Sequence, residues 1–302
     1  MFTARIRMTE VVRTRSARLA SAVSLALGAL ALTAAAASAG VVYDNLPGTL
    51  PGSMYSVGGQ EWKINEIGGQ VGLVSTERKK PTVEVAMVTR ACQIGQVALE
   101  TCETPKPNKK FKLPVTLKVY EVGPGNSVGL LIESATRNIK VPYRPSKDTV
   151  NCTEGRWYDA TEHKCNNGMA FVATFKLGKL HRIPTNAIIS LAYNTETYGP
   201  APIGAAACDS ASAGCPYNYV NLAITEPNEH RLTVGTQPAA PDLYLNTENP
   251  EYFEQYEEPG YIQCYKGPEP FTAGAPIGVS GTFSLNNCLA SMQPVFKVSA
   301  SA

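Results

Sequence analysis

Apolar and polar residues alternate over short runs in residues 40–302, and clusters of Gly, Pro, Asn and Asp separate these runs. In the run 82–88, two valines and a methionine occupy alternate positions, as expected for a half-buried strand. The run 115–120 alternates in the same way and meets 128–132 across the Gly-rich link 123–127, whose length is typical of a hairpin. Further strands are predicted at 70–75, 169–177, 187–194, 219–224, 242–246, 278–285 and 294–299.

No stretch of residues 40–302 shows a sustained apolar stripe with the 3.6-residue period of a helix. The sequence therefore predicts an all-β fold of about ten to twelve strands, a β-sandwich or jelly roll with long disulfide-pinned loops. We expect residues 40–302 to form a single domain. The segment 226–302 is the less regular part, but it still carries strand-like runs and is expected to pack on the same body as a C-terminal extension.

The first 39 residues have the pattern of a secretory signal peptide. Five arginines precede an apolar run from Leu19 to Ala36, and the run ends in Ala37-Ser38-Ala39, a small-residue cleavage pattern. The alternative is a membrane anchor that stays attached, although its apolar stretch is near the lower length limit and consists largely of Ala, Ser and Thr. The expected destination is extracellular, with the periplasm as a second possibility, and no membrane span is expected once the signal is removed.

Removing the signal changes the charge balance. The whole chain has 27 basic and 25 acidic residues, and without five arginines and Glu10 the balance is 22 against 24, a net charge of −2. Nucleic-acid binding requires a clustered positive surface, so we expect no nucleic-acid partner.

All cysteines lie in the segment expected to be mature, and an even count behind an export signal predicts disulfides. Eight cysteines allow 105 pairings, and sequence neighbours suggest four local loops. The suggested pairs are Cys92–Cys102, Cys152–Cys165, Cys208–Cys215 and Cys264–Cys288. The alternative, metal ligation, is disfavoured because no C-x-x-C occurs and the three histidines are scattered without zinc-type spacing. We therefore expect no metal and no cofactor.

We find no motif in the sequence that assigns a catalytic activity. The serine-nucleophile elbow, H-E-x-x-H, the P-loop and the EF-hand loop are all absent. A hydrolase that uses two carboxylates stays open as an alternative, because their separation cannot be obtained from sequence. Its candidate residues are Asp159, Glu196, Asp209 and the acidic stretch 248–258.

Loop aromatics are the candidate ligand-binding residues. Trp157 and Tyr158 lie on the loop that a Cys152–Cys165 disulfide would close, and a rigid aromatic pair suits weak stacking on a sugar or contact with a protein. The structural alternative is that Trp157 plugs the end of the core. The full candidate set is Tyr143, Trp157, Tyr158, Tyr198 and Tyr217.

A set of short motifs runs through residues 43–225. They are YDNLP at 43–47, PGS at 51–53, EIG at 66–68, VEVAM at 83–87, PYRP at 142–145, WYD at 157–159, C-x-NG at 165–168, AYNT at 192–195, YG at 198–199, PIG at 202–204 and GCPY at 214–217. The set resembles a family of exported bacterial proteins of unknown function. That family carries no established activity, so the resemblance assigns no catalytic or binding residue. Some of its members end in a surface-sorting tail, which this sequence lacks, and a free secreted form is therefore expected.

Together these observations favour a secreted, non-enzymatic β-sandwich module that binds through its surface, with carbohydrate as the favoured ligand class. The expected partner is an extracellular polysaccharide or a cell-surface component. The alternatives are a secreted hydrolase acting on polysaccharide through carboxylates, and a purely structural envelope or adhesion protein.

Overall fold

The computed structural model divides the chain into two compact units, Met1–Ala36 and Ala37–Ala302. All of the described residues lie in the second unit. They are 39–57, 64–74, 78–95, 97, 99–178, 182–193, 220–226, 229, 231–238, 243–247, 283–286 and 292–301. The predicted signal peptide at 1–39 lies outside them except for its last residue, and it stays a prediction.

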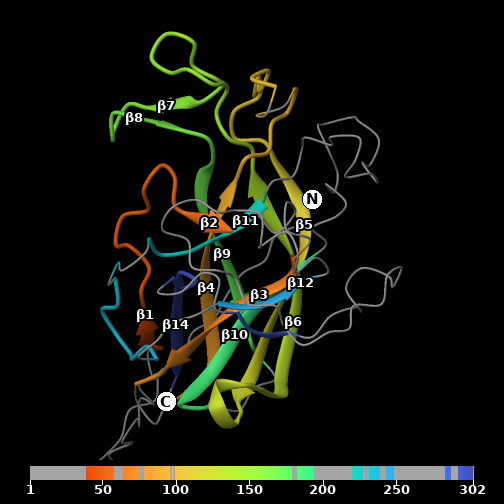
Figure 1. Ribbon diagram of the computed structural model, residues 1–302, viewed down its shortest axis with the longest axis vertical. Helices are drawn as coiled ribbons and strands as arrows, with labels where there is room; N and C mark the ends of the chain where they lie inside the picture. The colour runs from red at the N-terminus through yellow and green to blue at the C-terminus, as the bar shows by residue number, and fades with distance from the viewer. Residues whose placement is uncertain are drawn as a thin grey trace, which may run out of the picture. The chain divides into compact units, whose positions relative to one another are not determined.

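The first sheet has six antiparallel strands organised around β4 (Figure 1). Their bounds are β1 (Gly40–Asp44), β2 (Ser56–Val57), β4 (Lys79–Thr89), β9 (Met169–Lys176), β11 (Val220–Ala223) and β14 (Phe296–Ser301). β9 pairs with β4 from Thr82 to Thr89, whereas β14 and β11 divide the other edge of β4 between them. β14 also pairs with β1, so the two ends of the second unit meet in this sheet.

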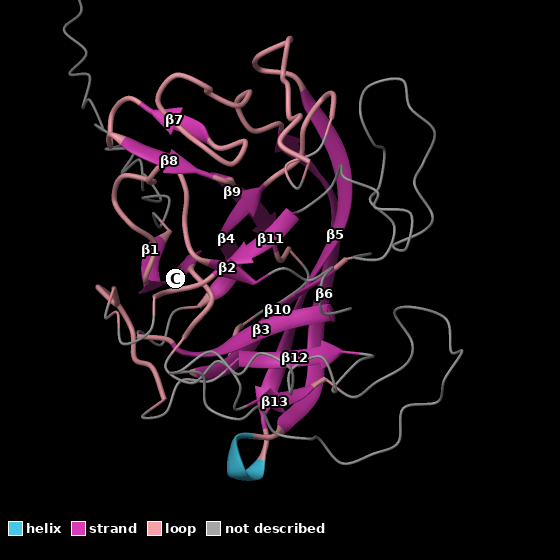
Figure 2. Cartoon of the chain, turned by 45° about the horizontal axis from the view of Figure 1, so that its top comes forward, coloured by secondary structure: helices cyan, strands magenta, loops and turns pink. Residues whose placement is uncertain are grey.

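The second sheet also has six antiparallel strands, in the order β13-β12-β3-β10-β5-β6. Their bounds are β3 (Ile64–Gly72), β5 (Lys110–Val122), β6 (Val128–Pro142), β10 (Asn186–Ala192), β12 (Leu243–Thr247) and β13 (Ser284–Asn286). β5 and β6 form the predicted hairpin, and its turn contains the short 3-10 helix η1 (Pro124–Asn126), drawn in cyan in Figure 2. Gly125 and Asn126 take positive φ angles there, which Gly and Asn adopt most readily.

The inward faces of both sheets contribute to one hydrophobic core cluster. In β5 buried and less buried residues alternate, and Leu117 is fully buried opposite Leu191 of β10. β4 contributes Val83, Val85 and Met87 to the same cluster. This confirms the all-β prediction, and the only helix among the described residues is η1. The narrower description as a sandwich or jelly roll stays a prediction.

The other face of the second sheet carries a buried carboxylate. Glu66 Oε1 accepts hydrogen bonds from Ser190 Oγ at 2.5 Å and from the Tyr120 hydroxyl at 2.8 Å, and its Oε2 accepts from Lys118 Nζ at 2.6 Å. The four residues come from the adjacent strands β3, β10 and β5. Burial, followed by the negative charge of Glu66, raises the pKa of Tyr120 well above its ordinary value. The Glu66 carboxylate on β3 therefore connects side chains of β10 and β5 through hydrogen bonds.

Two of the four predicted disulfides are present, Cys92–Cys102 and Cys152–Cys165. The first is fully buried, and the second is partly exposed. The other two predicted pairs, Cys208–Cys215 and Cys264–Cys288, lie outside the described residues. None of the described helices is long and apolar enough to cross a membrane.

Tyr43 predicts how stability depends on alkaline pH. Its hydroxyl donates to Gln293 Oε1 at 3.3 Å, and burial raises its pKa to about 12. A folded-state pKa above the unfolded one gives stability that is complete below pH 10 and is lost as the pH rises towards 12. We expect the wild type to lose about 1.4 kcal/mol more than Tyr43→Phe between pH 9 and pH 11. Urea unfolding of both proteins at the two pH values measures this difference, and equal losses would contradict it.

Candidate functional site

Arg144, two residues beyond the end of β6, holds the loop that contains the second disulfide. Its side chain is fully buried and donates three hydrogen bonds to backbone carbonyls. Nε donates to Pro145 at 3.0 Å, Nη1 to Asn167 at 2.9 Å and Nη2 to Gly155 at 2.7 Å. Gly155 follows Cys152 inside the disulfide loop, and Asn167 follows Cys165 just beyond it. The Arg144 side chain therefore holds the chain near both cysteines.

The main chain of Arg144 reaches the other disulfide loop. Its N–H donates to the Ala91 carbonyl at 3.0 Å, and its carbonyl accepts from Thr104 Oγ1 at 2.7 Å. Among the described residues no carboxylate bonds to the guanidinium, and burial, followed by repulsion from Arg90, lowers the pKa of Arg144 to about 10. Arg144 thus connects the two loops and keeps a positive charge between them at neutral pH.

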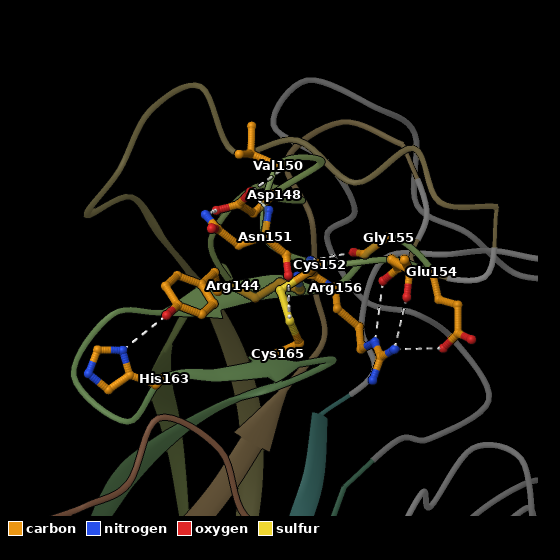
Figure 3. The surroundings of a disulfide bond; sticks show 12 residues. Arg144, Asp148, Val150, Asn151, Cys152, Glu154, Gly155, Arg156, His163 and Cys165 are labelled. Carbon is orange, nitrogen blue, oxygen red and sulfur yellow. Dashed lines mark hydrogen bonds and ion pairs between the residues drawn. A yellow bond between two sulfur atoms is a disulfide. The ribbon is translucent and has the colours of Figure 1, made fainter.

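Surface hydrogen bonds and an ion pair hold the turn before Cys152 and the first residues of the disulfide-closed loop (Figure 3). Asp148 accepts from the backbone and the side-chain amide of Asn151, which holds the turn before Cys152 and lowers the pKa of Asp148. On the other side, Arg156 bonds to Glu154 and to Thr153 at the surface. The loop leads into the hairpin of β7 (Trp157–Asp159) and β8 (Lys164–Asn166), which follows Cys152 and contains Cys165.

A segment near the N-terminus packs against this hairpin. The Gly52 N–H donates to Glu162 Oε1 at 3.1 Å, and its carbonyl accepts from the Ala170 N–H at 3.0 Å. A Cβ at Gly52 would lie 2.0 Å from an Asp159 carboxylate oxygen and 3.1 Å from the Trp157 ring, so a larger residue would have to displace the Asp159 side chain. The close approach makes the 51–53 segment and the 157–159 strand pack directly on each other.

Next to this contact lies an open pocket of about 460 Å³. Four parts of the chain line it: the 51–56 segment leading into β2, Arg90 at the end of β4, the β7–β8 hairpin, and the segment that follows β11. Its lining residues are Pro51, Ser53, Met54, Tyr55, Ser56, Arg90, Glu162, Lys164, Asn166, Ile224, Glu226, Glu229 and Arg231. The disulfide loop therefore supports one wall of the pocket.

One feature of the pocket suits a ligand with an apolar face. Tyr55 is 55% exposed and lines the pocket, so its ring offers a surface for stacking. Asn166 also lines the pocket, and its Nδ2 atom is buried without a hydrogen-bond partner among the described residues. Because this atom has almost no accessible surface, a ligand in the pocket does not reach it in this structure.

The predicted aromatic site residues do not gather on one surface. Tyr143 is buried against Phe111, with ring centroids 5.1 Å apart, and Trp157 is buried while its Nε1 donates to the Gly168 carbonyl at 2.8 Å. Both rings are buried, which favours the alternative that Trp157 plugs the end of the core. That Tyr143 and Trp157 bind a ligand stays a prediction.

Tyr158 is the one described candidate that is partly exposed, and its hydroxyl lies 3.0 Å from His163 Nδ1. Tyr158 does not line the pocket. That it binds a ligand stays a prediction. The remaining two candidates, Tyr198 and Tyr217, lie outside the described residues.

Sequence reasoning missed Tyr55, Arg90 and Asn166. Tyr55 follows the Pro51-Gly52-Ser53 motif by two residues, and Asn166 is the variable position within C-x-NG, so both stood next to motifs already noted. Nothing in the sequence set Arg90 apart from other arginines, because its place in the pocket depends on how the end of β4 lies beside the β7–β8 hairpin.

The carboxylates proposed for a hydrolase are largely untested. Asp159 Oδ1 accepts from the N–H groups of Thr161 and Glu162, which is a turn-capping role. Glu196, Asp209 and 248–258 lie outside the described residues. Within the described part of the chain, no group of His, Cys, Asp and Glu side chains is arranged to hold a metal ion.

Comparisons with protein-family models, with curated proteins and with solved structures find no match for this chain. The resemblance to exported bacterial proteins stays a prediction.

Proposed function

We propose that this chain is a secreted, non-enzymatic binding module, and that its ligand is a carbohydrate held in the pocket beside Tyr55. The observation that supports this proposal most directly is the exposed Tyr55 ring in an open pocket of about 460 Å³. Pockets of this volume accept small ligands, and a ring face with a few polar groups around it is the arrangement that fixes an amphipathic ligand.

Several properties of the pocket support a sugar over an apolar molecule. Charged and amide side chains make up much of the wall. A pyranose presents hydroxyl groups at its edges and C–H groups on its faces, so it can satisfy the polar wall and lie on the ring at the same time. The two disulfides suit an oxidising extracellular space, where polysaccharides and cell-surface glycans are available.

The pocket wall is also rigidly supported, which lowers the entropy cost of binding. The Cys152–Cys165 bridge and the Arg144 hydrogen bonds fix the loop behind β8, and Gly52 holds the Tyr55 segment against the hairpin. A site built in this way presents its polar groups without first ordering a mobile loop.

Replacing Tyr55 tests the proposal directly. On a glycan array and by calorimetry with the best glycan, we expect Tyr55→Ala to weaken binding about ten-fold, because the stacking face is lost. Tyr55→Trp is expected to keep binding. Tyr158→Ala removes a second partly exposed tyrosine that lies outside the pocket lining, and it should leave the affinity unchanged.

Each other outcome counts against the proposal. Loss of binding in Tyr158→Ala but not in Tyr55→Ala would move the site to the 157–163 hairpin. Absence of glycan binding by the wild type would overturn the carbohydrate ligand. New reducing ends during incubation with the bound polysaccharide would favour the hydrolase alternative instead.

A further inference from the structure

The carboxylates in the pocket wall are mostly engaged within the protein. Glu229 accepts from Arg231 Nε through Oε1 and from the Glu226 N–H at 3.0 Å through Oε2. Glu162 accepts from the Gly52 N–H through Oε1. Of the three acidic residues in the wall, only Glu226, an exposed residue, has a side chain that makes no hydrogen bond or ion pair within the described part of the chain.

The basic groups show the opposite pattern. The side chains of Arg90 and Lys164 form no hydrogen bond or ion pair with any described residue. Among the described residues, two cations in this wall, Arg90 and Lys164, are thus without a partner, and two carboxylates, Glu162 and Glu226, have no cation partner.

A further positive charge lies behind the wall. The buried guanidinium of Arg144 donates to the carbonyl of Asn167, the neighbour of Asn166, and bonds only to carbonyls. Its repulsion with Arg90 contributes to its lowered pKa, so the two charges act on each other. In a partly buried site such a field is screened less than at an open surface.

We propose that the pocket selects anionic saccharides, and that Arg90 and Lys164 bind the carboxylate or sulfate group while the sugar ring lies on Tyr55. The inference rests on the proposed function and adds to it the charge class of the ligand. An anionic group would pair the two cations that have no partner, Arg144 behind the wall adds to the positive field, and charge-assisted hydrogen bonds of this kind are the stronger ones. The exposed ring favours a saccharide over an acidic peptide, because it offers a stacking face in addition to charge.

A matched pair of ligands separates charge from ring shape. Oligogalacturonate and its fully methyl-esterified form have the same rings and differ in charge. By calorimetry we expect the acid to bind at least ten-fold more tightly than the ester, and raising NaCl from 50 to 500 mM to weaken only the acid. A sulfated neutral oligosaccharide and its desulfated form repeat the comparison, and the preferred pair distinguishes carboxylate from sulfate.

The variants assign the selectivity to residues. Arg90→Gln is expected to bring acid and ester to within about two-fold of each other, whereas Tyr55→Ala should weaken both by the same factor. Circular dichroism checks that Arg90→Gln is folded. If it is not, Lys164→Gln replaces an exposed side chain on β8 and is expected to reduce the preference for the acid by about three-fold or more.

The outcomes separate this inference from the proposed function. Equal binding of charged and uncharged forms in both ligand pairs overturns the inference and leaves carbohydrate binding intact. Binding of none of the four ligands, together with a blank glycan array, overturns both. Poly-glutamate that binds as tightly as oligogalacturonate and is insensitive to Tyr55→Ala would assign the pocket to an acidic peptide and overturn the inference.

Discussion

Replacing Arg144 by Met is expected to lower the free energy of unfolding by about 3–5 kcal/mol. The substitution removes three hydrogen bonds from a fully buried side chain and leaves the carbonyls of Pro145, Gly155 and Asn167 without a donor. Methionine fills a similar volume, so the loss reports the bonds more than the packing. Urea unfolding at pH 7 measures it.

Arg156 provides a matched control within the same loop. Its guanidinium bonds to Glu154 and to Thr153 at the surface, where such contacts are worth little (Figure 3). Arg156→Met is expected to cost less than about 1 kcal/mol. Similar costs for the two variants would show that Arg144 does not hold the two disulfide loops together.

Replacing Glu66 by Leu is expected to cost about 3–4 kcal/mol of unfolding free energy. The side chain accepts from Lys118, Tyr120 and Ser190 at once, and Ser190 is fully buried, so its hydroxyl would lose its acceptor in an apolar setting. Because these donors lie on β10, which pairs with β3, and on β5, which pairs with β10, the effect is on the pairing of the second sheet.

A double-mutant cycle isolates this cluster from simple burial. Lys118→Met alone removes one donor that is partly exposed and should cost less than Glu66→Leu. The double variant is expected to be more stable than the sum of the single changes predicts, since the ammonium is no longer left without its carboxylate. Additive costs would contradict a coupled cluster.

Alternation in the sequence predicted the strands β4 and β5, because each of them buries one face against the core, and the Gly-rich link at 123–127 predicted the hairpin of β5 with β6. It missed β7 and β8, which are three residues long and too short to show a period. It also ended β6 too early, since most residues of this strand are not buried and no alternation marks them. Short and exposed strands are held mainly by backbone hydrogen bonds to a neighbouring strand. The sequence of the strand itself carries no pattern that identifies this neighbour.

The two described disulfides followed from sequence neighbours, because local loops are the simplest pairing for cysteines 10 and 13 residues apart. The candidate site was predicted less well. Trp157 and Tyr143 attracted attention as aromatics near a disulfide, yet both are buried, and the exposed ring of the pocket is Tyr55. Residue type suggests that an aromatic is useful, but exposure is a property of the surrounding fold.

The sequence by itself determined that the chain is all-β and that its cysteines at 92 and 102 and at 152 and 165 close local loops, because period-2 alternation and short separations act along the chain. Only the tertiary structure decided that Arg144 binds carbonyls in a buried position and that Arg90, Asn166 and Tyr55 share one pocket. These contacts join residues far apart in sequence. Their energetics depend on burial and hydrogen-bond geometry, which exist only once the sheets have packed.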